Sequence, residues 1–170
     1  SIKASPDGST LYLGGSFTKI NDVGTYRVGA VSAADGSRRH LGLAANATVK
    51  AVELSKDGST LYIGGAFTDV NSQTRQRVAA FDLGSRTLKD FAPGVADRSV
   101  LAIAAAPDGN GVAIGGSFTS VNGSTSPGYG MAILENDGTV RSNSLTSVVR
   151  NGDAKGAIMS LRADSQGLYG

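Results

Sequence analysis

The stretch at residues 57–68 reads Asp-Gly-Ser-Thr-Leu-Tyr-Ile-Gly-Gly-Ala-Phe-Thr, and the chain contains this phrase more than once. A close copy occupies residues 7–18, a more divergent copy occupies residues 108–119, and a shortened fourth copy starts at Asp164. The first three copies begin 50 and then 51 residues apart. A period of this size is typical of stacked supersecondary units. The sequence therefore predicts a repeat protein.

Composition and charge exclude several classes of protein. The 170 residues include no Cys, so disulfides, thiolate zinc sites and a Cys nucleophile are excluded. The 16 basic and 14 acidic side chains are scattered along the chain, whereas a nucleic acid site needs a clustered basic face. We therefore expect no nucleic acid partner. The sequence has no long apolar run, so we expect no membrane span.

The second copy shows the clearest pattern of strands and turns. Residues 49–54 alternate apolar and polar side chains, as a half-buried strand does. Asp57-Gly58 marks a tight turn, because Asp bonds the backbone ahead of it and Gly accepts a positive φ. Gly64-Gly65 allows one backbone to approach another closely, and the Phe67 ring is expected between two sheets. The unit is predicted to contain strands at 49–54, 60–63, 77–82 and 87–91, with a polar loop at 69–76.

Each unit thus holds four short strands joined by turns, and no segment has the apolar stripe of a helix. Four-stranded units of about 50 residues are the blades of a β-propeller. The predicted fold class is therefore all-β, a β-propeller of four-stranded antiparallel blades with about three blades plus partial ones. The units are residues 1–48 with a clipped first strand, 49–99, 100–157 with divergent loops, and 158–170 as the start of a fourth repeat.

The repeat resembles known propeller repeats. Its Gly-Gly pair is similar to that of kelch-type blades, although this chain lacks the Trp that kelch repeats place in strand four. The fuller resemblance is to bacterial propeller repeats of unknown function, with the consensus Ser-Pro-Asp-Gly-Ser-x-Leu-Tyr-x-Gly-Gly-x-Phe-Thr followed by an arginine before strand three. Repeats in fungal cell-surface polarity markers are similar. The resemblance implies a secreted or cell-surface protein. The matching segments are 5–21, 55–71 and 107–123, with Arg27 and Arg77 at the arginine.

Three units and a fraction are too few to close a ring of four to eight blades. An uncovered blade face of several hundred Å² would cost on the order of 10 kcal/mol at ~25 cal/mol per Å², which rivals the stability of a whole domain. We therefore expect these units to pack against remaining blades of the same protein or against other copies of the chain.

Polar positions that recur from unit to unit are the candidate metal ligands. Asp7, Asp57 and Asp108 recur at the turn, where they form either a ring of carboxylates for cations or, as we favour, ordinary hairpin chemistry. Asn21 and Asp22 are weak calcium candidates, because oxygen ligands at alternate positions are typical of calcium loops. The loop lacks the terminal bidentate Glu of such a loop. We expect no cofactor, with calcium at this loop as the one alternative.

Arg27, Arg77 and Tyr129 are the candidate contact residues. The two arginines recur just before the third strand, where a guanidinium either grips a carboxylate or sugar or bonds carbonyls of a neighbouring loop. Tyr129 lies in the divergent loop of the third unit, where an exposed ring would contact carbohydrate or protein. Tyr12 and Tyr62 alternate with apolar neighbours and are expected to pack.

No catalytic constellation stands out. His40 is the single His, and Glu53 and Glu135 are the only glutamates. The leading hypothesis is a non-catalytic extracellular or cell-surface scaffold that binds protein or glycan through its loops, foremost at 120–130 and 140–155. One alternative is the propeller part of a secreted carbohydrate-active enzyme with its catalytic residues outside this segment. Another is a structural repeat of a surface assembly.

Overall fold

All regular structure in the described part of the chain is β-strand. The computed structural model describes residues 1–125, 129–142, 150–151 and 154–170. Every element within these residues is a strand, and none is a helix, which confirms the all-β prediction. The same residues therefore include no helical segment that is long and apolar enough to cross a membrane.

The first repeat forms a four-stranded antiparallel sheet in the order β1-β2-β5-β6. Leu11 and Val31 are paired in register and share one face. Between β2 and β5 the small hairpin β3–β4 folds back over the sheet, so that a Cβ added to Gly29 would lie 2.6 Å from Ile20 Cδ1. The bounds are β1 Ile2–Ala4, β2 Thr10–Gly14, β3 Lys19–Ile20, β4 Val23–Gly24, β5 Val28–Ser32 and β6 Arg38–Arg39.

The second repeat forms a sheet of the same kind, in the order β12-β11-β8-β7. Two predictions were wrong in detail. The polar loop at 69–76 is a hairpin, because Asn71 and Ser72 take φ values of 48° and 61° and make the tight two-residue turn that hairpins favour. The fourth strand ends at Leu88, because Phe91 leaves the sheet to pack its ring edge-on against Tyr62. The bounds are β7 Val49–Leu54, β8 Thr60–Gly65, β9 Asp69–Val70, β10 Gln73–Thr74, β11 Val78–Asp82 and β12 Thr87–Leu88.

The third repeat departs from the predicted four strands, since its described residues form a three-stranded sheet, β13-β14-β15. In place of a fourth strand there is a single bridge between Leu134 and Val140, with one further bond from Arg141 N to Ile133 O at 2.8 Å. Beyond it lie the hairpins β16–β17 and β18–β19, the latter at the predicted fourth repeat. The bounds are β13 Val100–Ala105, β14 Val112–Gly116, β15 Met131–Leu134, β16 Arg150–Asn151, β17 Ala154–Lys155, β18 Arg162–Asp164 and β19 Gly167–Tyr169.

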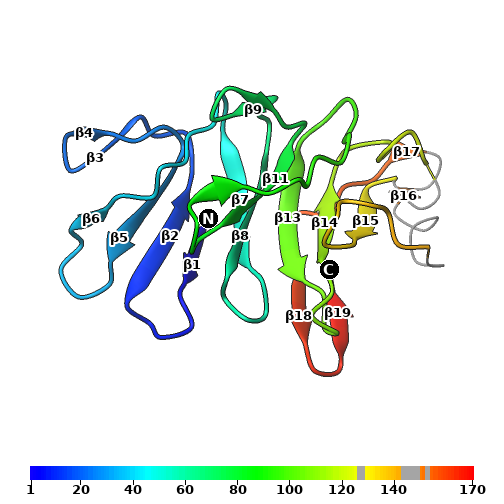
Figure 1. The fold of residues 1–170 in the computed structure, drawn as a ribbon. Coiled ribbons are helices and arrows are strands. Elements are labelled where there is room, and N and C mark those ends of the chain that lie inside the picture. The colour runs from blue at the N-terminus through cyan, green and yellow to red at the C-terminus, as the bar shows by residue number, and fades with distance from the viewer. Residues whose placement is uncertain (126–128, 143–149, 152–153) are drawn as a thin grey trace.

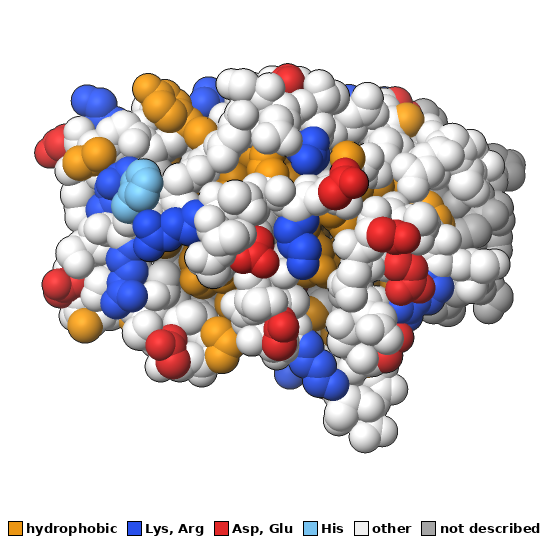
Figure 2. Space-filling model, viewed as in Figure 1, with side chains coloured by type: hydrophobic (Ala, Val, Ile, Leu, Met, Phe, Trp, Pro, Cys, Tyr) orange, Lys and Arg blue, Asp and Glu red, His pale blue; other side chains and the backbone are white. Residues whose placement is uncertain are grey.

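The sheets stand side by side like a fan (Figure 1). Their first strands lie innermost, with β7 against β1 and β2, β13 against β7 and β8, and β18 against β13. The described strands form no closed ring. The surface carries both charges, and Figure 2 shows basic and acidic side chains interspersed on the face in view.

The core lies between neighbouring sheets, as the sequence predicted. Phe67 is fully buried in a cluster that joins Val28 of the first sheet to Phe81 of the second. The glycine pair is also explained, because a Cβ on Gly65 would lie 2.1 Å from Thr48 O. Only glycine allows this approach of one backbone to another. The repeated phrase therefore specifies how neighbouring segments pack.

Candidate binding site

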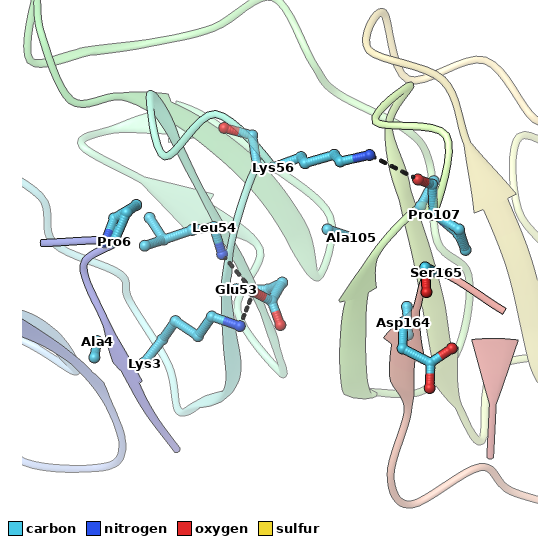
Figure 3. Close-up of a pocket in the computed structure, with 13 residues that line it drawn as sticks. Lys3, Ala4, Pro6, Glu53, Leu54, Lys56, Ala105, Pro107, Asp164 and Ser165 are labelled. Atoms are coloured by element: carbon cyan, nitrogen blue, oxygen red, sulfur yellow. Dashed lines mark hydrogen bonds and ion pairs between the residues drawn. The ribbon is translucent and has the colours of Figure 1, made fainter. Parts of the chain in front are cut away.

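A hollow of about 390 Å³ opens where the innermost strands of all four repeats end. It lies at the end of the sheets that carries the Asp-Gly turns, and Figure 3 shows the residues that line it. Each repeat contributes part of the wall, so the hollow exists only because the four units pack together. Its principal lining residues are Lys3, Ala4 and Pro6 of the first repeat, Glu53 to Lys56 of the second, Ala105 to Pro107 of the third, and Ala163 to Ser165 of the fourth.

One wall carries an ion pair between consecutive repeats. Lys3 is in register with Tyr12, and Glu53 is in register with Tyr62, so the two charges occupy corresponding positions in β1 and β7. Lys3 Nζ lies 2.5 Å from Glu53 Oε1, and their side chains are 41% and 15% exposed. The backbone N–H of Leu54 also donates to Glu53 Oε1 at 2.8 Å. The carboxylate is therefore held from two sides.

The other charged groups are also tied to their turns. Lys56 Nζ donates to Pro107 O at 3.2 Å and joins the second repeat to the third (Figure 3). Asp164 Oδ1 accepts the backbone N–H groups of Gln166 and Gly167, at 2.8 and 3.2 Å. The side chain of Asp164 thus closes the β18–β19 turn while it lines the hollow opposite Lys3.

The hollow is balanced in charge and mixed in polarity. Two amines and two carboxylates line it beside apolar groups such as Pro6 and Pro107. Such a wall offers both donors and acceptors, and it suits an uncharged polar ligand better than an ion. Among the described residues, no group of three or more His, Cys, Asp or Glu side chains is placed to hold a metal ion.

The two glutamates are both paired with cations. Glu53 pairs with Lys3, whereas Glu135 forms a bidentate contact with Arg141, at 2.5 Å to Nε and 3.0 Å to Nη2. The Arg141 hydrogen bond is the main cause that lowers the pKa of Glu135. A general acid of a glycosidase needs a raised pKa instead, so the geometry at Glu135 does not resemble one.

The repeated aspartates serve their turns. Asp7 Oδ1 accepts Ser5 Oγ at 2.5 Å and Ser9 N at 3.0 Å. These bonds, led by the Ser5 hydroxyl, lower the Asp7 pKa to about 2, and Asp57 shows the same arrangement and pKa. At Asp108 the Asn110 N–H is the main cause of a lowered pKa, with a smaller effect of Arg141.

The calcium candidates lie at the tip of the β3–β4 hairpin. Asn21 and Asp22 take φ values of 48° and 60°, and Asn21 Nδ2 donates to Gly36 O at 3.1 Å. In the second repeat the corresponding residue, Asn71, binds the linker between the first and second sheets, since its Oδ1 accepts a hydrogen bond from the Ala44 N–H at 2.8 Å. In the third repeat Asn122 Oδ1 accepts one from the Gly94 N–H at 2.7 Å. This geometry assigns Asn21 a structural contact, and calcium there stays a prediction.

Arg27 and Arg77 occupy a backbone position that favours glycine. Both have a φ of 67°, and the third repeat has Gly130 there, with a φ of 71°. Arg77 Nη1 donates to Val95 O at 2.8 Å, which is the inter-loop bond considered above. Tyr129 precedes Gly130 and is half-buried. These candidates therefore lie away from the hollow, near the other ends of the innermost strands.

The sequence interpretation did not include the residues that line the hollow. Lys3 and Glu53 precede the Ser-x-Asp-Gly turn by the same number of residues in consecutive units, and their charges are opposite. Opposite charges at equivalent positions of neighbouring units indicate an ion pair between them. Asp164 gave no such indication, because it belongs to a shortened repeat.

The sequence matches no protein-family model, and no curated protein is similar to it.

Proposed function

We propose that this chain is a non-catalytic binding module with β-propeller blades, and that it acts at the cell surface or outside the cell. The carrying observation is the hollow at the innermost strands, to which all four repeats contribute. Propellers commonly bind ligands near the line where their blades meet. The proposed location rests on the resemblance of the repeat to secreted and surface-displayed proteins.

The ligand we propose is an uncharged glycan. Sugar hydroxyls both donate and accept hydrogen bonds, so they match a wall that carries both amines and carboxylates. The apolar Pro6 and Pro107 can contact the C–H face of a sugar ring. A volume of about 390 Å³ lies within the ~300–1,000 Å³ of typical ligand pockets, which suits one or two sugar residues.

The test is an NMR titration of the labelled 170-residue chain with neutral disaccharides such as cellobiose and chitobiose. Amide shifts should change at Lys3, Glu53 and Asp164, and Glu53→Gln should weaken the response at least fivefold. Lys50→Gln is the control, because Lys50 lies exposed on the same strand and does not line the hollow. Absence of shifts at these amides at millimolar sugar would contradict the proposal.

One observation favours a second role, in assembly. On the first sheet Ile2 is 67% exposed, whereas Val52 at the corresponding position of the second sheet is 5% exposed and packs in the core between them. We propose that this face packs against a sheet of the same repeat from a second copy of the chain. Light scattering should then show a dimer that Leu13→Glu dissociates, because Leu13 is paired in register with Ile2 and shares its face. A monomer of parent and variant at high concentration would overturn this role.

A further inference from the structure

A second hollow, of about 190 Å³, lies at the outer edge of the first sheet. Its floor is apolar and includes Val28 and Leu41, which are 0% and 8% exposed. Its rim carries the consecutive side chains Arg38, Arg39 and His40. Among the residues that the structure describes, no acidic side chain lines it. The hollow is therefore apolar at its base and basic at its mouth.

This hollow exists because the first repeat has small side chains where the second has large ones. Thr25 corresponds to Arg75, since their amides donate to Thr18 O and Thr68 O in the two hairpins. In the second repeat the Arg75 guanidinium crosses this space and donates to Lys89 O at 3.2 Å. The short Thr25 leaves the same space open.

A second exchange enlarges the space. Leu41 stands where the second repeat has Phe91, which is fully buried. The smaller side chain therefore deepens the floor of the hollow in the first repeat. Together with Thr25, this exchange makes the hollow a property of one repeat and not of the fold.

The basic rim is also particular to the first repeat. The second repeat has Leu88-Lys89-Asp90 where the first has Arg38-Arg39-His40, so its charges cancel. In Figure 2, basic side chains gather beside the pale blue histidine, and no acidic side chain lies next to it. A local excess of cations without a carboxylate favours an anionic ligand.

Two side chains at this hollow, Arg38 and Tyr26, are positioned to contact such a ligand. Arg38 Nε donates to Thr25 Oγ1 at 2.9 Å, and Thr25 is 7% exposed, so the guanidinium is anchored at the mouth. This bond uses one of its five N–H groups, and the planar fork keeps donors for a bidentate oxyanion. Tyr26 also lines the hollow and is 51% exposed, which offers a ring face and a hydroxyl.

We propose that this hollow binds an acidic glycan, through a sulfate or carboxylate that contacts Arg38 and Arg39 while the sugar ring lies on Tyr26. The site is separate from the hollow at the innermost strands, and it differs in ligand charge. It therefore goes beyond the function proposed above and does not depend on it.

The test is an NMR titration of the 170-residue chain with a sulfated disaccharide and with the same disaccharide after desulfation. Only the sulfated sugar should shift the amides of residues 38–43, and its Kd should rise with added salt. Arg39→Gln and His40→Gln should each raise the Kd at least threefold. Arg98→Gln, which removes one exposed charge elsewhere, should leave the Kd unchanged.

A filling variant separates shape from charge. Thr25→Arg copies the second repeat and places a guanidinium in the space, so it should raise the Kd at least tenfold although it adds a positive charge. Unchanged or tighter binding by Thr25→Arg, equal loss in Arg98→Gln, or equal binding of the desulfated sugar would each overturn the proposal. Glu53→Gln should leave this Kd unchanged, so the two sites are tested independently.

Discussion

The first and second sheets contain the same repeated phrase and have nearly the same backbone structure, yet their corresponding side chains differ in burial. In the second sheet Leu61 and Phe67 are fully buried, because a sheet covers each face. In the first sheet Leu11 and Phe17 hold the same positions and are only half-buried. The phrase therefore specifies a sheet with two faces made for packing, and a neighbouring sheet decides how much each side chain stabilises the fold.

The phenylalanine of the phrase gives the largest expected contrast. Phe67→Ala should lower the free energy of unfolding by ~3–5 kcal/mol, because it empties a fully buried site between two sheets. Phe17→Ala should cost roughly 1–2 kcal/mol, since part of that ring already contacts water. Urea denaturation of both variants measures the difference. Equal losses would show that the outer face of the first sheet is covered in solution, as the assembly role requires.

The second glycine of the pair gives the next contrast. A Cβ on Gly65 would meet Thr48 O at 2.1 Å, and backbone must move to relieve this clash. Gly65→Ala should therefore cost about 3 kcal/mol. A Cβ on Gly15 would meet only the Phe17 ring, at 2.9 Å, and this half-buried ring can turn away. Gly15→Ala should cost less than about 1 kcal/mol in the same urea experiment. A cost at Gly15 equal to that at Gly65 would mean that the Phe17 ring is locked.

The arginine before the third strand gives a smaller effect. Arg77→Ala keeps the positive φ and loses the bond to Val95 O, so it should cost about 2 kcal/mol. Arg77→Gly loses the same bond but relieves the backbone, so it should be about 1 kcal/mol more stable than Arg77→Ala. Thermal and urea unfolding compare the two variants. If alanine were the more stable replacement, the left-handed backbone at this position would be contradicted.

Local features of the fold were predictable from the sequence, and features that depend on distant partners were not. The Asp57-Gly58 turn and the approach at Gly65 follow from residue types within a few positions. The departure of Phe91 from its strand depends on Tyr62, which lies far away along the chain. The attachment of the Asn71 turn likewise depends on a linker from the preceding repeat, because the Ala44 N–H donates to the Asn71 side chain.

The same distinction explains the candidate sites. Lys3 and Glu53 are separated by a whole repeat, and their contact depends on how two sheets pack. The basic hollow arises because the first repeat has the short Thr25 where the second repeat has Arg75, whose side chain fills the corresponding space. This difference is recognised only when the two repeats are superposed. The repeated phrase predicts where sheets form. The differences between its copies determine where a ligand can enter.

Substitution of the aspartate in the repeated phrase should have the same effect on stability in both sheets, because the turn is exposed in both. Asp7 and Asp57 each have a pKa of about 2 in the fold, below the usual 3.8. A carboxylate with a lowered pKa stabilises the fold above its unfolded pKa, and this contribution is lost as the pH falls from about 4 to about 2. Asp57→Asn and Asp7→Asn should therefore flatten the acid limb of stability in this window by equal amounts. Urea midpoints between pH 5 and pH 2 measure this slope. A change in slope for Asp57→Asn alone would show that the neighbouring repeat, through Lys56 and its bond to Pro107, acts on the turn as well.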